Sequence, residues 1–209
     1  MGRILALTGG VGGAKLALGL SQILAPDELL FAVNTGDDFE HLGLHISPDL
    51  DSLTYALSQQ NNTETGWGRA GESWNFIETL GALGGEAWFR LGDKDLALHT
   101  ARTQMLKSGA TLSQATAAIT QNMGIEHTVA PMSDSPVRTI VHSDQGDLAF
   151  QHYFVREGCG PKVSGFSFDG IANAELNPLI REWLADCDGV IICPSNPVSY
   201  THLTLPTST

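Results

Sequence analysis

The chain has 209 residues, of which 42% are hydrophobic and 16% charged, a composition typical of a globular protein with one substantial core. Its formal net charge is −12 and only 11 Lys and Arg residues are spread through it, which argues against a nucleic-acid-binding surface. No segment reaches the roughly 20 apolar residues of a membrane span, no signal peptide is recognisable, and the three cysteines have no metal-binding spacing, so we expect a cytoplasmic protein.

The first half of the chain alternates between strand and helix patterns. A short apolar run at 4–7 predicts a strand, the glycine-rich run at 8–13 a turn, and the apolar spacing over 14–24 a helix. A second buried strand is predicted at 29–33. A helix through residue 56 follows, with Ser47 or Asp49 as its N-cap.

The second half continues the alternation. Strands are predicted at 88–91, 137–141, 148–155 and 189–193, and helices at 96–106, 111–124 and 176–184. Thr111 with Gln114 forms a capping-box signal for the second of these helices. The order predicts a Rossmann-like three-layer α/β sandwich with a mainly parallel sheet, left incomplete at the C-terminus.

The glycine run lies where a strand meets a helix, and backbone N–H groups at a helix N-terminus suit a phosphate. Lys15 stands where a dinucleotide-binding G-x-G-x-x-G motif needs its third glycine, and the P-loop pattern is absent. Tight helix–strand packing explains the glycines equally well.

Two acidic pairs follow the second predicted strand. Asp37 and Asp38 end it, while Asp49 and Asp51 open the next helix, and a parallel topology brings both loops to one sheet edge. Magnesium prefers such oxygen ligands, although each Asp taken singly also suits a turn or a cap.

A third acidic pair, Asp93 and Asp95, comes before His99 and Arg102. These last two residues share a helix face, and Arg102 is expected either to bind phosphate or to form a surface salt bridge.

Six strings in this order and spacing closely resemble the CofD family of 2-phospho-L-lactate transferases. They are GGVGGAK at 9–15, VNTGDD at 33–38, ISPDLD at 46–51, LGDKD at 91–95 with Ala97 and His99, PMSD at 131–134, and PSNP at 194–197. The resemblance covers residues 1–198 and implies a magnesium-dependent transfer. A phospho-acid moves from a guanylyl-activated three-carbon acid, the donor, to the ribityl hydroxyl of a deazaflavin, releasing GMP.

The resemblance also implies roles for individual residues. Asp37 is expected to hold the metal with help from Asp38, and Asp51 is expected to contact the deazaflavin and to orient or deprotonate its hydroxyl, which makes Asp37 and Asp51 the catalytic pair. The remaining substrate-binding residues are expected to be Gly10, Gly12, Gly13, Lys15, Asp49, Lys94, Ser195 and Asn196.

Two departures from the family pattern limit these expectations. Lys94 replaces an Arg that many relatives carry, which keeps the charge but loses bidentate geometry. Residues 199–209 lack family character and helical periodicity, so we expect an artefactual tail on a truncated domain. The resemblance implies that the full-length protein is a homodimer.

Two rival interpretations stay open at this stage. One is a relative of the same fold that binds a nucleotide without transferring a group. The other is a Rossmann-type oxidoreductase with Asp37 as its ribose contact, which the missing third glycine disfavours.

Overall fold

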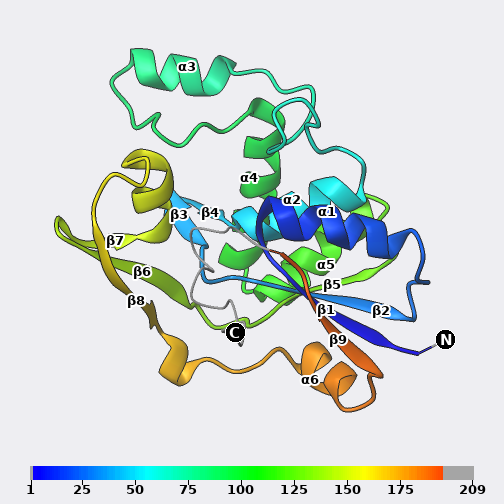
Figure 1. The fold of residues 1–209 in the computed structure, drawn as a ribbon. Helices are drawn as coiled ribbons and strands as arrows, with labels where there is room; N and C mark the ends of the chain where they lie inside the picture. Colours follow the sequence, from blue (N-terminus) through cyan, green and yellow to red (C-terminus); the bar gives the residue numbers. More distant parts are fainter. Residues whose placement is uncertain (1, 195–209) are drawn as a thin grey trace.

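The computed structural model describes residues 2–194 (Figure 1). Its elements in chain order are β1 (Ile4–Thr8), α1 (Gly10–Ser21), β2 (Leu29–Val33), β3 (Phe39–His41), β4 (Leu44–Ile46), α2 (Pro48–Leu57), α3 (Asn75–Ala82), α4 (Asp93–Lys107), α5 (Leu112–Asn122), β5 (Thr128–Pro131), β6 (Arg138–Ser143), β7 (Gly146–Ala149), the π-helix η1 (His152–Arg156), β8 (Val163–Asp169), the 3₁₀ turn η2 (Ile171–Asn173), α6 (Pro178–Leu184) and β9 (Gly189–Ile192).

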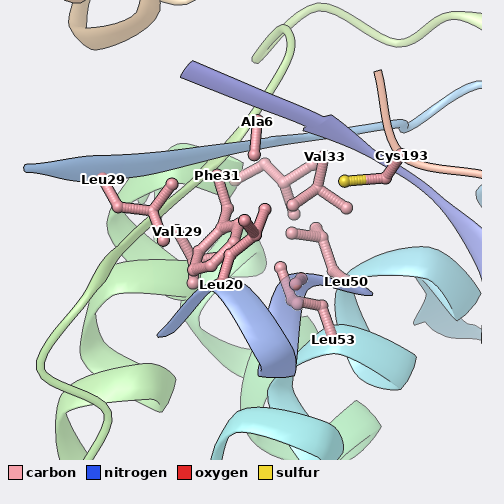
Figure 2. Packing of buried hydrophobic residues seen from close by; sticks show 11 residues of the cluster. Ala6, Leu20, Leu29, Phe31, Val33, Leu50, Leu53, Val129 and Cys193 are labelled. Carbon is pink, nitrogen blue, oxygen red and sulfur yellow. The ribbon is translucent and has the colours of Figure 1, made fainter. Parts of the chain in front are cut away.

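A parallel sheet in the order β5-β2-β1-β9 forms the centre of the molecule. Side chains alternate between its faces, so Ala6 and Phe31 lie on one side and Leu5 and Leu30 on the other. On the first side the strands pack against α1, α2 and α5, and Figure 2 shows Leu20, Leu50 and Leu53 closing over them.

Helix α6 covers the opposite face. Ile180 and Trp183 pack on Leu5 and Leu30, and the Trp183 indole N–H donates to the Ile4 carbonyl at 3.1 Å. Helices therefore lie on both faces of a parallel sheet, which confirms the predicted three-layer α/β sandwich (Figure 1). No helix within residues 2–194 is long and apolar enough to cross a bilayer.

Two smaller sheets stand beside this core, and of their strands the sequence patterns predicted β6 and part of β7 but not β3, β4 or β8. One is the β3–β4 hairpin, and the other is the antiparallel sheet β7-β6-β8. Their strands are short or only half-buried, so their side-chain patterns are weak.

One predicted strand is wrong and another is only partly correct. Residues 88–91 form no strand; Trp88 and Phe89 instead pack against Phe39, with ring centroids 6.0 Å and 4.9 Å away. The strand predicted at 148–155 ends at Ala149, and η1 follows. Phe150 and Tyr153 are both buried beside Val141, and a spacing of three is met by a helical turn, not by a strand.

The predicted helices agree better with the structure. The capping box of α5 is confirmed, since Gln114 N–H donates to Thr111 Oγ1 at 3.2 Å and Thr111 N–H to Gln114 Oε1 at 2.9 Å. Helices α1 and α4 each begin earlier than the apolar spacing predicted, at Gly10 and Asp93.

Exposed apolar side chains line part of the α6 face of the sheet. Leu7, Val190 and Ile192 are 38%, 47% and 78% exposed, and strand pairing places Leu7 beside Ile192. Their neighbour Ile191 points to the opposite face and packs against the core.

We predict that Ile192→Thr lowers the fluorescence of a hydrophobic dye bound to the protein and leaves the free energy of unfolding within about 0.5 kcal/mol of wild type. The matched substitution Ile191→Thr on the core side should destabilise by roughly 1–3 kcal/mol. Denaturant titrations with dye binding check both values, and equal destabilisation by the two variants would contradict this assignment of faces.

Candidate active site

The glycine-rich stretch forms the first turn of α1. Gly9 is the extended N-cap residue, and Gly10 has a left-handed φ of +62° that favours glycine. A Cβ on Gly13 would collide with Thr8 Oγ1 and would lie 3.4 Å from the Pro194 carbonyl, so the end of β9 passes close over this turn. The turn therefore borders the crevice between β1 and β9, where the sheet order reverses and open α/β sheets bind ligands.

Asp49 joins this turn to the loop after β2. Its carboxylate accepts the Asn34 side-chain N–H at 2.9 Å and the backbone N–H of Gly10. A Cβ on Gly9 would lie 2.7 Å from Asp49 Oδ2, so glycine is needed there for the carboxylate to approach.

Asp37 lies in the loop after β2, close enough to Asp49 of α2 for the two charges to interact. Burial, then the negative charge of Asp49, raises the pKa of Asp37 to about 7, while a hydrogen bond from the Thr139 side chain opposes the rise. Burial also raises the pKa of Asp49, to about 6, against the hydrogen bonds from Asn34 and Gly10. The two carboxylates therefore oppose each other's ionisation, and the residues around them do not fully compensate their charge.

Asp38 has different partners from its neighbour Asp37. Its Oδ2 accepts the Ser47 hydroxyl at 2.8 Å and lies 3.1 Å from His45 Nε2, whereas its Oδ1 is buried without a hydrogen-bond partner. Ser47 occupies the N-cap position of α2, but its hydroxyl donates to Asp38 and makes no cap hydrogen bond.

Within residues 2–194, no group of three or more His, Cys, Asp and Glu side chains is arranged to hold a metal ion. A site of two carboxylates completed by phosphate oxygens of a substrate is the usual arrangement for magnesium. The uncompensated pair Asp37 and Asp49 fits that arrangement, whereas Asp38 shares one of its oxygens with Ser47 and His45.

Asp51, predicted to contact the deazaflavin, lies in a buried ion pair. Both of its oxygens bind the Arg102 guanidinium, through Oδ2 at 3.2 Å and through a shorter contact to Oδ1, and the two residues are 5% and 2% exposed. Arg102 thus makes neither of the contacts predicted for it, a phosphate fork or a surface salt bridge.

The ion pair continues into a polar layer between α2 and α4. His99 lies 3.5 Å from Asp51 and 3.2 Å from Asp95, and the Tyr55 hydroxyl donates to Asp95 through a short contact. His99 and Arg102 share a face of α4 as predicted, but that face is buried against α2.

The LGDKD string joins α3 to α4. Asp93 accepts the backbone N–H of Phe76 at 3.1 Å in the first turn of α3, and Glu72 accepts the backbone N–H groups of Lys94 and Asp95 in the first turn of α4. A Cβ on Gly92 would collide with Glu72, so this glycine permits the reciprocal capping.

The other predicted site residues are placed as follows. Gly10, Gly12, Gly13, Asp37, Asp38 and Asp49 come together at the carboxyl edge of the sheet. Lys94 is exposed at the α3–α4 junction and Lys15 is exposed on α1, while Ser195 and Asn196 lie outside the described residues. The sequence analysis assigned no role to Asn34, His45 or Thr139; Asn34 lies within one of the six strings, but nothing local marked His45 or Thr139.

Sequence comparison shows that the chain is similar to known transferases. The model of the family described as 2-phospho-L-lactate transferase CofD matches residues 4–202. The chain is 40% identical to the phosphoenolpyruvate transferase of Kitasatospora aureofaciens over 202 residues and 34% identical to the 2-phospho-L-lactate transferase of Methanosarcina mazei over 192 residues. These matches cover 94% and 92% of the chain, but the chain spans only 63% of the length of either curated relative.

Structural comparison supports the fold alone. A UPF0052-family protein from Bacillus halodurans superposes with a TM-score of 0.60 at 15% identity, covering 93% of this chain and 59% of that one. A second crystal structure, of protein BH3568 from Bacillus halodurans, superposes with a TM-score of 0.63 at 14% identity. It covers 99% of this chain and 63% of that one.

We predict that Asp37→Asn stabilises the metal-free protein at pH 8 and flattens its pH dependence. The raised pKa means that folded Asp37 binds its proton more tightly than the unfolded chain does, so stability is lost as the pH rises from about 4 through about 7. Since one pKa unit corresponds to about 1.4 kcal/mol, the gain at pH 8 should be on the order of 2–4 kcal/mol.

Urea titrations between pH 4 and pH 8 check this expectation, and exposed Asp27→Asn serves as the control. If the free energy of unfolding varies with pH in the same way for wild type and Asp37→Asn, the pKa of Asp37 is not raised in the folded protein and the prediction is wrong.

We predict that Arg102→Met destabilises the fold by roughly 3–5 kcal/mol, because it leaves the Asp51 charge buried without a partner. Adding Asp51→Leu should recover most of this loss. Equilibrium unfolding of the two single variants and the double variant measures the coupling, and additive losses would contradict the ion pair.

Proposed function

The chain belongs to the 2-phospho-L-lactate transferase CofD family, and we propose that it transfers a phospho-lactate or phosphoenolpyruvate group onto a deazaflavin in coenzyme F-420 biosynthesis. The donor is lactyl- or enolpyruvyl-2-diphospho-5′-guanosine and the acceptor is 7,8-didemethyl-8-hydroxy-5-deazariboflavin. GMP is the second product.

One structural observation supports the proposal in addition to family membership. Asp37 and Asp49 form an uncompensated carboxylate pair directly beside the glycine turn that opens α1. Phosphoryl transfer requires positioning and charge neutralisation more than a protein nucleophile. A cation site next to a phosphate-binding turn supplies both.

The proposed step is a single displacement at phosphorus. The ribityl hydroxyl oxygen of the deazaflavin attacks the phosphorus that bears the three-carbon acid, and a new P–O bond forms. The bond from that phosphorus to the bridging oxygen breaks, its electron pair leaves with GMP, and the hydroxyl proton passes to a carboxylate.

We assign that proton to Asp37, not to Asp51. Both Asp51 oxygens bind Arg102 in the interior, so Asp51 is not free to accept a proton from a substrate. Asp37 accepts a hydrogen bond from the Thr139 side chain and forms no ion pair with a cationic side chain within residues 2–194, so its carboxylate is available to the hydroxyl proton. Asp51 then acts indirectly, by fixing α2 and with it Asp49.

Magnesium is the proposed cofactor, and Asp37 and Asp49 would hold it together with phosphate oxygens of the donor. When bound, the ion supplies neutralisation of the charge that develops on the diphosphate. The protein itself contributes the Gly10 N–H, which with the Asn34 amide holds Asp49 in place.

Two further expectations, a cytoplasmic location and a homodimer at full length, stay predictions. The first rests on the sequence, in which neither a signal peptide nor a membrane span is recognisable, and the second rests on the family resemblance. No described contact bears on either.

The test is a turnover assay with purified chain, deazaflavin alcohol, the lactyl donor and magnesium, followed by mass spectrometry of the deazaflavin product and quantification of GMP. Asp37→Asn should lower kcat by about 100-fold or more, within the range expected on losing a general base. Asp27→Asn should retain wild-type turnover. Equal production of GMP and phospho-deazaflavin by Asp37→Asn would overturn its assignment as base.

A further inference from the structure

Strand β6 reaches the acidic loop from outside the central sheet. Its own sheet, β7-β6-β8, pairs with no strand of the central sheet within residues 2–194 and has a separate buried cluster of Val141, Phe150 and Tyr153. Thr139, the second residue of β6, nevertheless lies against the loop after β2, and its backbone N–H donates to the Gly36 carbonyl at 2.6 Å. Thr139 therefore joins two parts of the fold that have separate cores.

Gly36, the residue before Asp37, is held from two sides. Its N–H donates to Asn34 Oδ1 at 3.0 Å, and its carbonyl accepts the Thr139 N–H. A Cβ on Gly36 would lie 2.9 Å from Thr139 Oγ1 and 3.1 Å from Asn34 Oδ1, so a side chain here would displace one of these two groups. The backbone that leads into Asp37 is thereby fixed by β6 and by Asn34 together.

The Thr139 side chain continues this contact onto the carboxylate itself. Its hydroxyl donates a hydrogen bond to Asp37. Asp37 is half-buried, whereas the other three aspartates of this edge are 2%, 7% and 5% exposed, namely Asp38, Asp49 and Asp51. One donor restrains the rotation of the Asp37 carboxylate but leaves it open to a substrate, since an ionised carboxylate has about four acceptor sites.

We propose that Thr139 is a positioning residue, whose hydroxyl holds the Asp37 carboxylate in the orientation from which it accepts the proton of the acceptor alcohol. The inference rests on the proposed function, in which Asp37 accepts that proton. It adds that the sheet β7-β6-β8 takes part in the reaction, because Thr139 belongs to that sheet and fixes both the backbone before Asp37 and its carboxylate. A displacement of a reacting group by about 1 Å can cost roughly 100-fold in rate, so such a restraint has a measurable effect.

The first experiment compares Thr139→Val and Thr139→Ser in the turnover assay with the lactyl donor, the deazaflavin alcohol and magnesium. The nearly isosteric Thr139→Val removes the hydroxyl and keeps the backbone N–H. It should lower kcat by about tenfold, because a hydrogen bond to a charged group is lost, and leave KM for either substrate within about twofold of wild type. Thr139→Ser keeps the hydroxyl and should restore kcat to within about threefold of wild type.

Ser164→Ala is the matched control. It removes a hydroxyl from the same sheet, where Ser164 is exposed and donates to the His142 carbonyl at 3.2 Å, away from the acidic loop. This variant should keep the kcat and KM of wild type. A loss caused by loosening the sheet alone would appear in Ser164→Ala as well.

A second experiment tests the contact without turnover. Thr139→Val should lower the urea concentration at the unfolding midpoint of the wild-type chain at pH 8. It should leave the midpoint nearly unchanged in an Asp37→Ala background, because the partner of the hydroxyl is then already absent. Circular dichroism of each variant confirms that it starts from the folded state.

The outcomes separate this inference from the proposed function. Wild-type kcat in Thr139→Val, an equal loss of kcat in Thr139→Ser, or additive shifts of the unfolding midpoint would each overturn the inference and leave the proposed function intact. If the wild-type chain forms neither GMP nor a phosphorylated deazaflavin, the proposed function fails and the inference fails with it.

Discussion

The carboxylate of Asp49 is the contact on which the functional edge of this fold depends. It belongs to α2, accepts the Gly10 N–H at the start of α1, and accepts the Asn34 amide in the loop after β2. Three elements that are separate in sequence are thereby held against one group. Gly9 makes the contact possible, since any side chain there would collide with the carboxylate. A helix N-terminus attracts an anion, so the fold uses its own carboxylate to fix the turn beside which a substrate phosphate is proposed to bind.

Four aspartates converge here in a chain whose net charge is already −12, and the structure compensates them unequally. Asp51 has a full guanidinium partner in Arg102, and Asp38 has a serine hydroxyl and a histidine on one of its oxygens. Asp37 and Asp49 receive only neutral hydrogen-bond donors, and the pKa of each is raised, chiefly by burial. The repulsion between them favours a bound cation, because the cation offsets a cost that the free protein carries. Unequal compensation therefore separates carboxylates that hold the fold from carboxylates that are available for chemistry.

The sequence predicts those elements and site residues that depend on local patterns. Buried apolar runs identified β1, β2 and β9, the Thr111–Gln114 box identified the start of α5, and parallel topology placed Asp37 and Asp49 at one edge. The partners of Asp51 were not predictable in this way, because Arg102 lies 51 residues along the chain and its helix face carries no apolar periodicity to mark it as buried. The same holds for Asp93, which accepts hydrogen bonds from Ser73, Asn75 and Phe76 at the start of α3. Aromatic residues at 88–89 and 150–154 suggested strands because strands are rich in them. The first pair instead lies in a half-buried loop and the second segment in the helical turn that contains η1, and only tertiary packing distinguishes these cases from strands.

The two adjacent aspartates of the GDD string, Asp37 and Asp38, have different hydrogen-bond partners and therefore different roles in the site. Asp37 accepts a hydrogen bond from the Thr139 side chain and is repelled by Asp49, which accepts the Gly10 N–H of the glycine turn. Asp38 accepts the Ser47 hydroxyl at the start of α2 and lies 3.1 Å from His45 Nε2 in β4. The loop after β2 therefore leaves Asp37 uncompensated beside the glycine turn, while its neighbour Asp38 fixes the loop to β4 and α2.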